Sequence, residues 1–385
     1  MKISIFGSSS TGLLVRLIAA HIFGTLFAYT VYTRFTQLGD RYESNDLATY
    51  LEKIGGGEGL TSTIFTLAVY TNLGSVLPNF LSPMLLSIFI AIFTWFAFRD
   101  VYTHLSHKLF WTCNLFPHFL IWSGTASKEQ LVILSGMVII NFAAKRSFAA
   151  KNLSISLIFV VLAMLVILLI RPNYFVIYFV IFSTALISPW LHRIVSRRLS
   201  VGVWIFIFSL LTSGVIAYLA LASRFFNEDV IDFMDRVQTS FHAYSSAGSN
   251  RYDIQWENFY DFLYNSLWGI PQGFIGPTLI EGISKPVQFP AFLEGVLYLS
   301  ILVYLFYKLL QLSIKSRILR LHILPYIYVC FAIIFVSYPF LIFNPGSALR
   351  YKQSMHPILI FYPLLILAYY RANNLIKTKI KKTSD

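Results

Sequence analysis

The chain has 385 residues, of which 57% are hydrophobic and only 12% are charged, and its formal net charge is +13. A soluble domain carries about 25% charged residues, so this composition excludes an ordinary water-soluble enzyme, a disordered protein and a secreted disulfide scaffold. Apolar runs of roughly 18–20 residues recur along the chain. They predict an all-α, polytopic integral membrane protein with about ten transmembrane helices, in which residues 1–385 form a single membrane domain.

The predicted transmembrane helices follow one another from the first to the last segment of the chain. They cover approximately residues 11–33, 79–98, 109–125, 130–144, 152–170, 173–191, 201–222, 291–310, 321–343 and 356–371. The stretch Thr61–Leu77 is less apolar and is interrupted by Thr71, Asn72 and Gly74. We interpret it as an interfacial or re-entrant helix and not as a further span.

Charged residues are divided unevenly between the two sides of these helices. Most lysine and arginine residues fall on the side that also holds both termini, whereas nearly all acidic residues fall on the other side. This asymmetry is the positive-inside pattern, so we expect both termini in the cytoplasm. It explains the basic excess without a nucleic-acid partner. Three longer segments are then predicted on the outer side, at residues 34–78, 224–290 and 344–356.

The first outer segment places carboxylates next to a span. Asp40 is the closest of them to the membrane, and Glu43 and Asp46 follow it. A carboxylate within reach of a hydroxyl can act as a general base, which makes Asp40 a catalytic candidate. Glu43 and Asp46 are more typical of a solvated face.

The third and fourth predicted spans are short and are joined by the sequence Trp-Ser-Gly-Thr-Ala-Ser-Lys-Glu-Gln, residues 122–130. Short spans draw their connection inward, which predicts that Lys128 and Glu129 lie below the outer membrane surface. Ionisable groups at that depth are costly and usually functional. The alternative is an ion pair between Lys128 and Glu129 that closes a helical hairpin.

Arg171 is followed by Pro172 between two long apolar runs with almost no loop. Proline cannot continue the preceding helix. The guanidinium of Arg171 then either reaches the lipid headgroups or points into the helix bundle.

The second outer segment predicts an amphipathic helix from Phe226 to Phe241 and another helix that begins at Asn250. Arg251 lies at the start of the second helix, where free N–H groups and a guanidinium together form a phosphate site. Trp256 and Tyr260 lie one turn apart and could stack on a sugar or a lipid. The alternative is that both rings anchor the helix at the membrane interface.

The third outer segment reads Asn-Pro-Gly-Ser-Ala-Leu-Arg-Tyr-Lys and continues to a histidine. Arg350, Lys352 and His356 lie on the side from which basic residues are usually excluded. An anionic ligand would compensate these charges, and lipid headgroups are the alternative. His104 and His107 are the only close histidine pair, in a basic loop, and we predict no metal site there.

Together, the Trp-Ser-Gly-x-x-Ser-Lys-Glu, Arg-Pro and Asn-Pro-Gly-Ser-Ala-Leu-Arg-Tyr-Lys motifs resemble those of the bacterial O-antigen and capsule repeat-unit polymerases. These are Wzy-like enzymes within the wider GT-C style of membrane glycosyltransferase. The Gly-Asp-Arg-Tyr-Glu stretch at residues 39–43 is similar to the acidic first-loop motif of GT-C enzymes, although it lacks their adjacent acidic pair.

The resemblance implies polymerisation of undecaprenyl-pyrophosphate-linked repeat units at the periplasmic face of the bacterial inner membrane, for lipopolysaccharide, capsule or exopolysaccharide. The resemblance also implies that the reaction uses no cofactor and no nucleotide sugar. It further implies two partner proteins from the same biosynthetic pathway, a chain-length regulator and a flippase. Arg251 and Arg350 would clamp the pyrophosphate, and Asp40 or Glu129 would accept the proton. The predicted substrate-binding residues are Lys128, Arg171, Tyr351, Lys352, His356, Trp256 and Tyr260, with His356 also a reserve base.

Three other functions remain open at this point. A GT-C glycosyltransferase would use the same cations to add one sugar from a polyprenyl-phosphate donor. A transporter or flippase would place its sites at the bilayer midplane between repeated halves, and the sequence shows no such repeat. A non-catalytic membrane scaffold would tolerate the loss of the charges in the outer segments.

Overall fold

The computed structural model is built from α-helices, and the residues that it describes contain no β-strand. These residues are 8–32, 68–70, 72–73, 76–77, 80–148, 154–195, 259–316, 319, 322–323, 326–327, 329–330, 342 and 345–384. The chain divides into two compact units. The first comprises Met1–Ser188, Ser300–Cys330 and Lys352–Asp385, and the second comprises Pro189–Leu299 and Phe331–Tyr351.

Four helices in the described part of the chain are long and apolar enough to cross a membrane. They span Ser10–Val31, Leu81–Phe98, Lys128–Phe148 and Phe289–Ile314, and a bent pair, Ala348–Ser354 with Pro357–Asn374, would be a fifth. About twenty residues at 1.5 Å each match the ~30 Å hydrocarbon layer. The predicted span 201–222 and most of 321–343 lie outside the described residues.

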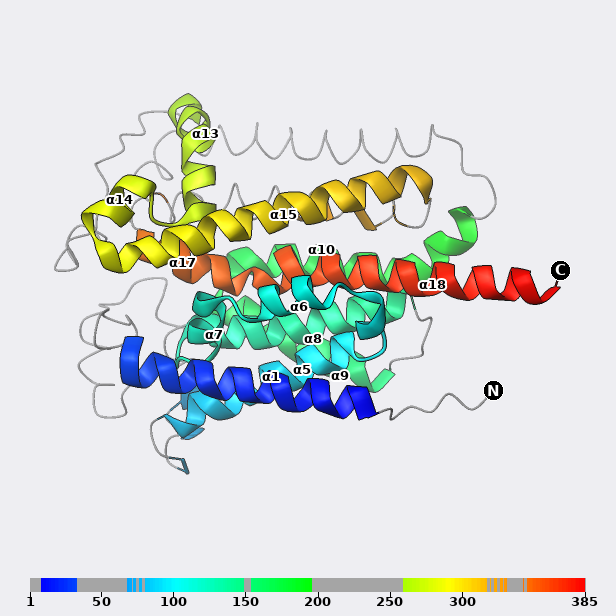
Figure 1. The fold of residues 1–385 in the computed structure, drawn as a ribbon, viewed down its shortest axis with the longest axis horizontal. Helices are drawn as coiled ribbons and strands as arrows, with labels where there is room; N and C mark the ends of the chain where they lie inside the picture. Colours follow the sequence, from blue (N-terminus) through cyan, green and yellow to red (C-terminus); the bar gives the residue numbers. More distant parts are fainter. Residues whose placement is uncertain are drawn as a thin grey trace. The chain divides into compact units, whose positions relative to one another are not determined.

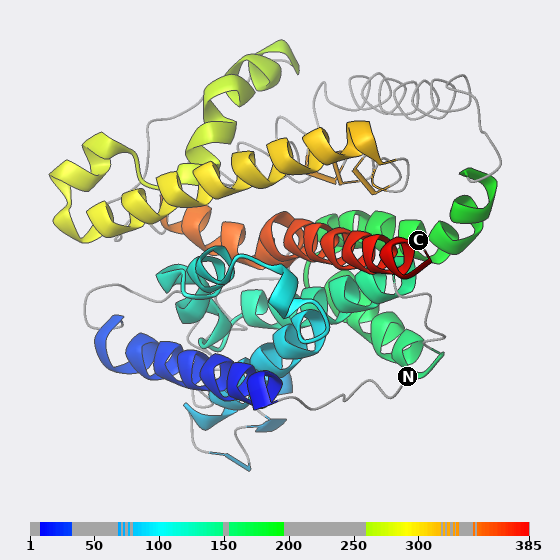
Figure 2. The same cartoon turned by 45° about the vertical axis from the view of Figure 1, so that its right-hand side comes forward.

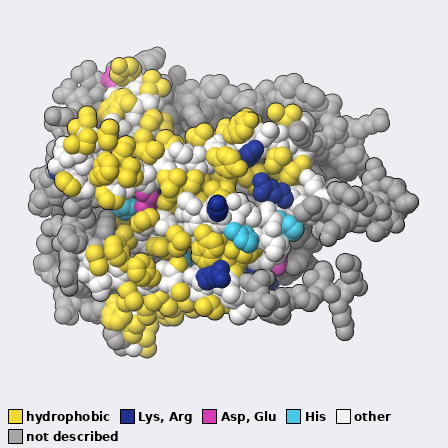
Figure 3. Space-filling view, viewed as in Figure 1, with side chains coloured by type: hydrophobic (Ala, Val, Ile, Leu, Met, Phe, Trp, Pro, Cys, Tyr) yellow, Lys and Arg dark blue, Asp and Glu magenta, His cyan; other side chains and the backbone are white. Residues whose placement is uncertain are grey.

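Apolar side chains also cover much of the described surface, as expected where lipid replaces water. On α9 (Ser154–Ile170), Ile158, Phe159 and Leu162 are each more than half exposed. Among the described residues on the face drawn in Figure 3, hydrophobic side chains cover large areas and charged side chains occupy small ones. Such an extended apolar surface is typical of a membrane protein. The structure thus confirms the all-α membrane class.

Most predicted spans within the described residues coincide with observed helices. The first becomes α1 (Ser8–Phe27), which continues as a π-helical turn, η1 (Ala28–Tyr32). The others correspond to α5 (Leu81–Phe98), α9, α10 (Pro172–Val195), α15 (Phe289–Lys315) and α18 (Tyr362–Ser384).

The predicted span at 109–125 is not one continuous helix, because two short helices occupy this region. Helix α6 (His107–Asn114) ends before Leu115, and α7 (Pro117–Ser123) begins with Pro117. A residue that precedes proline is driven out of the helical conformation, and Phe116 accordingly has ψ 120°. The chain is therefore broken between the two helices.

The following span is longer than predicted. Helix α8 (Lys128–Phe148) has 21 residues, so it could cross the hydrocarbon layer without shortening. Lys128 and Glu129 form its first turn and are not part of a loop. A short fourth span therefore does not draw Lys128 and Glu129 below the membrane surface, and this reason for their predicted depth is wrong. The burial of Glu129 has another cause, which is the packing of the surrounding helices.

Helices α1, α5, α7, α8 and α9 pack against one another in the first unit. Helix α5 packs against α1 and α8, α8 packs against α9, and α1 packs against α7, as Figures 1 and 2 show. Glycine permits the closest of these contacts: a Cβ added at Gly24 would lie 2.7 Å from Cβ of Leu120. A Cβ at Gly124 would lie 2.5 Å from the hydroxyl of Thr25.

The last outer segment predicted from the sequence contains helix α17 (Pro345–Ser354). A π-helical turn, η5 (Pro357–Phe361), joins it to α18, and the axis bends by 54° at this break. Pro357 has no N–H for the helical ladder, which explains the break. Two tyrosines bind carbonyls nearby: Tyr178 donates to Ser354 O at 3.4 Å and Tyr326 to Leu359 O at 2.8 Å.

The second unit contains α13 (Phe259–Ile275), α14 (Leu279–Ser284) and the start of α15. Gly276 has φ +86° and closes α13, a conformation that glycine adopts without strain. Thr278 and Glu281 then form a reciprocal capping box at the start of α14. Helices α13 and α14 lie within the predicted outer segment 224–290.

Candidate functional site

The predicted site residues fall into three groups in the structure. Lys128, Glu129, Arg171, Lys352 and His356 belong to the first unit. Arg350 and Tyr351 belong to the second unit. Asp40, Arg251 and Trp256 lie outside the described residues, as does the side chain of Tyr260 on α13.

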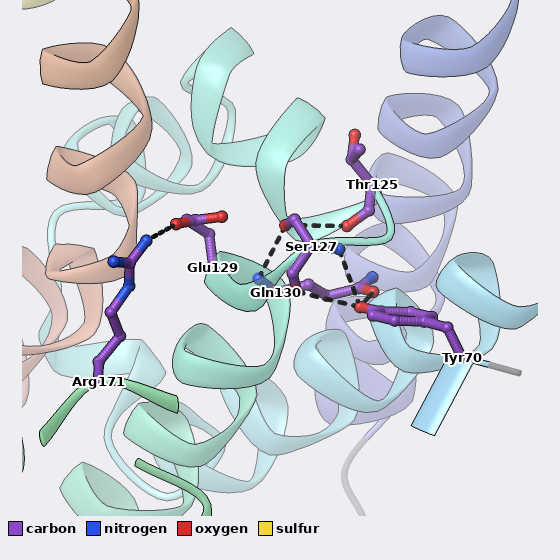
Figure 4. Close-up of polar contacts among 6 residues, drawn as sticks. All are labelled: Tyr70, Thr125, Ser127, Glu129, Gln130 and Arg171. Carbon is purple, nitrogen blue, oxygen red and sulfur yellow. Dashed lines mark hydrogen bonds and ion pairs between the residues drawn. The ribbon is translucent and has the colours of Figure 1, made fainter. Parts of the chain in front are cut away.

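Glu129 and Arg171 form an ion pair inside the first unit. Nη2 of Arg171 donates to Oε1 of Glu129 at 2.7 Å. The side chain of Glu129 is completely buried, and that of Arg171 is 20% exposed. Of the two orientations predicted for Arg171, the structure thus shows the one that points into the bundle (Figure 4). The ion pair joins residues that are 42 positions apart in the sequence.

The local sequence explains why Arg171 reaches this position. Its backbone N–H still bonds to Ile167 O, at the end of α9, while its carbonyl accepts from Tyr174 N at the start of α10. Pro172 begins α10, where its missing N–H costs nothing. The hairpin therefore turns at a single residue, Arg171, and this residue faces the start of α8.

Glu129 lies in the first turn of α8, where the helix dipole favours a negative charge. Ser127 precedes the helix, and its hydroxyl accepts from the N–H of Gln130 at 3.3 Å, as an N-cap does. Lys128 is the first helical residue and its side chain is partly exposed. The ion pair predicted as the alternative role of Glu129 was with Lys128, whereas the pair shown here is with Arg171.

A second group of polar side chains surrounds the same helix end on its other side. The hydroxyl of Tyr70 donates to Oε1 of Gln130 at 2.5 Å and accepts from the N–H of Ser127 at 3.2 Å. Nε2 of Gln130 donates to the carbonyls of Ser123, at 2.6 Å, and Pro83, at 2.7 Å. Burial raises the pKa of Tyr70 well above its usual value, so its hydroxyl stays protonated and can donate.

This network continues towards α1 and α5. Nδ1 of His21 lies 3.0 Å from Oγ of Ser87 and 3.2 Å from Oγ of Ser123, and all three residues are completely buried. Sequence reasoning assigned no role to Tyr70, Gln130 or His21. The available signals were a lone histidine inside an apolar run and a glutamine at the start of another.

His356 and Lys352 are enclosed near the bend before α18. The imidazole of His356 stacks on Phe119, with ring centroids 4.3 Å apart, and meets the edges of Phe116 and Phe361. Lys352 is only 1% exposed. Neither side chain lies on an open surface of the structure, so a role in direct substrate contact would require a change in the packing of this unit.

In the second unit, Arg350 lies over the ring of its neighbour Tyr351, with the guanidinium carbon 5.7 Å from the ring centroid. Both side chains are partly exposed. A guanidinium in this position can still contact an anion through its edge while its face rests on the aromatic ring. In the parts of the chain that the structure describes, no group of three or more His, Cys, Asp or Glu residues is placed to hold a metal ion.

The first unit therefore combines a buried carboxylate, its arginine partner and a partly exposed lysine at one helix start. The site can bind an anion through its cations, and the carboxylate can accept a proton when its arginine is engaged elsewhere. Comparison of the chain with models of known protein families, with curated proteins and with solved structures finds no match.

Proposed function

We propose that this protein polymerises undecaprenyl-pyrophosphate-linked oligosaccharide repeat units at the periplasmic face of the bacterial inner membrane. The observation that carries the proposal is the Glu129–Arg171 pair beside Lys128, within a helical membrane protein. The sequence motifs that hold Lys128, Glu129 and Arg171 are those that resemble the Wzy-like polymerases.

The reaction needs a site of this composition. The acceptor hydroxyl attacks the anomeric carbon of the growing glycan, the bond from that carbon to the phosphate oxygen breaks, and the diphosphate leaves with the bonding electrons. Fixed cations stabilise the negative charge that develops on the leaving group. A carboxylate takes the hydroxyl proton. The carrier lipid already lies in the bilayer, so binding loses fewer degrees of freedom than recruitment from water.

The ion pair offers a way to couple these events. When the diphosphate binds to Arg171 and Lys128, it competes with Glu129 for the guanidinium. A buried carboxylate that loses its cationic partner becomes a stronger base, because the charged form is then less stable. Arrival of the donor would thus prepare Glu129 to accept the proton. The sequence alone assigns the other expected roles, which remain predictions: Arg251 and Arg350 as further cations, Asp40 as the alternative base, and Tyr351, Lys352, His356, Trp256 and Tyr260 as binding residues.

The test is a reconstitution of the purified protein in lipid vesicles with a synthetic undecaprenyl-pyrophosphate-linked repeat unit. We expect a ladder of lipid-linked products that differ by whole repeat units. Arg171→Gln should lower kcat about 10²- to 10³-fold, the usual effect of removing one group that stabilises transition-state charge. Glu129→Gln should lower kcat about 10²- to 10⁴-fold, the usual contribution of a general base.

Arg99 provides a matched control for Arg171. It also belongs to the first unit and pairs with a carboxylate, Asp100, at 3.5 Å. Arg99→Gln should leave the ladder unchanged. A product that is longer by one sugar, made from a polyprenyl-phosphate sugar, would replace the polymerase proposal with the single-transfer glycosyltransferase. Normal ladders from both Arg171→Gln and Glu129→Gln would remove the ion pair from the mechanism.

A further inference from the structure

The side chain of Gln130 makes three hydrogen bonds at the start of α8. Its two amide hydrogens and its carbonyl oxygen are all used, by Pro83 O, Ser123 O and the Tyr70 hydroxyl. Ser123 ends α7, and the carbonyls at a helix end have no partner within the helix. Gln130 thus satisfies a carbonyl of α7 and contacts α5 through Pro83. Because the residue is completely buried, these bonds do not compete with water.

Tyr70 reaches the same helix end from a different part of the chain. It lies in a short helical stretch, residues 68–70, and only 5% of it is exposed. Its hydroxyl joins the side chain of Gln130 to the backbone of Ser127, the N-cap of α8. The hydroxyl oxygen of Tyr70 therefore connects Ser127, which precedes α8, to Gln130 in the first turn of α8.

Glu129 and Gln130 are neighbours on this helix, so their side chains leave the axis about 100° apart. Figure 4 shows Glu129 directed to Arg171 and Gln130 directed to Tyr70, on different sides of the helix. A rotation that broke the bonds of Gln130 would also turn Glu129 away from Arg171. The orientation of the Glu129 carboxylate therefore depends on the hydrogen bonds of the neighbouring Gln130 side chain.

We propose that Tyr70 and Gln130 are positioning residues that fix the first turn of α8, so that the carboxylate of Glu129 faces Arg171. The catalytic meaning of this inference rests on the proposed function, whereas the structural coupling does not. Tyr70 and Gln130 contact neither substrate nor reacting atoms in this scheme. They act by holding Glu129 in position, because a functional side chain is commonly kept in place by hydrogen bonds from the residues around it.

The first experiment measures the coupling between Glu129 and Arg171 without any assay of activity. Melting temperatures in detergent are determined for Glu129→Gln, Arg171→Gln and the double variant, which gives the non-additive part of the two shifts. The same cycle is then repeated in a Tyr70→Phe background. We expect the non-additive part to fall to less than about half, because the carboxylate is no longer held opposite the guanidinium.

Tyr326→Phe is the matched control. Tyr326 is also buried in the first unit and donates its hydroxyl to a backbone carbonyl, that of Leu359. The hydroxyl has the same chemistry as that of Tyr70, but the carbonyl that accepts from it lies in η5 and not in α8. Tyr326→Phe should lower the melting temperature and leave the coupling unchanged. An unchanged coupling in Tyr70→Phe would overturn the inference. If Tyr70→Phe does not fold, Ser127→Ala, which removes the hydroxyl bonded to Gln130 N, is measured in its place.

The second experiment follows the kinetics of polymerisation in vesicles. Tyr70→Phe should lower kcat about 100-fold and change KM less than about threefold, because a displaced catalytic group weakens the transition state more than substrate binding. Loss of coupling with an unchanged kcat would overturn the catalytic part of the inference. A wild-type protein without polymerase activity would instead contradict the proposed function, and the coupling experiment would still decide the positioning role.

Discussion

Glu129 is a charged residue with no exposure to solvent, and Arg171 is the cation that makes this placement tolerable. Removing a carboxylate from water costs several kcal/mol, which only a close opposite charge and hydrogen bonds can offset. The two partners are unequal, because the guanidinium retains some access to its surroundings and the carboxylate has none. This difference in exposure predicts which of the two substitutions destabilises the protein more.

We predict that Arg171→Gln destabilises the protein more than Glu129→Gln. The first variant leaves a buried carboxylate without its cation, which should cost about 3 kcal/mol. The second leaves an arginine that can turn to solvent or headgroups, and should cost about 1 kcal/mol. Thermal unfolding of the purified variants in detergent measures both values.

The double variant Arg171→Gln with Glu129→Gln completes this prediction. Two neutral amides can bond to each other, so the double variant should be more stable than Arg171→Gln alone. Equal stability of Arg171→Gln and Glu129→Gln would contradict this prediction. It would show that the buried carboxylate of Glu129 does not destabilise the protein when its cation is removed.

At the scale of secondary-structure elements, the close approach of α1 and α7 determines where the polar network can form. Helix α1 brings His21 to Ser123 at the end of α7, and Gly24 lies one turn later at the same contact. Small residues let helix backbones approach closely, which membrane helices use in place of a hydrophobic driving force. The glycine is therefore part of the reason that His21 and Ser123 meet.

We predict that Gly24→Ala separates α1 from α7 and destabilises the first unit by about 1–3 kcal/mol, since its methyl group would collide with Leu120. Gly12→Ala is the control on the same helix, because a Cβ there has no heavy atom within 4 Å. That variant should be neutral or more stable by about 0.5–1 kcal/mol, since alanine favours a helix. Unfolding in detergent compares the two, and similar losses in both would contradict the role of close packing.

At the scale of the whole molecule, the sequence was sufficient for the fold class and for most described helices. Periodic apolar runs determine such helices locally, so α1, α5, α9 and α15 could be predicted within a few residues. The broken span at 109–125 had a local signal too, since Pro117 lies inside it. The approximate count of ten spans remains a prediction, because the described helices account for four or five.

The arrangement of the site was less predictable, because it depends on contacts between distant residues. Arg171 and Glu129 could each be identified as charges in unusual places, but nothing in the sequence specified that they pair. Tyr70 was even less visible, since its partners, Ser127 and Gln130, lie 57 and 60 positions away. His356 was predicted on an outer segment, and the aromatic rings of Phe116 and Phe119 that pack against it come from elsewhere in the chain.

The final prediction concerns the sidedness on which the proposed periplasmic site depends. Thr103 and Ser284 are small, exposed hydroxyl residues, and the positive-inside pattern places them in the cytoplasm and the periplasm respectively. In a variant without Cys113 and Cys330, Ser284→Cys should react with a membrane-impermeant maleimide in intact cells. Thr103→Cys should react only after the inner membrane is permeabilised. If Thr103→Cys reacts in intact cells and Ser284→Cys does not, the protein has the opposite orientation in the membrane. The cations of the proposed site would then face the cytoplasm, where no periplasmic polymerisation can take place.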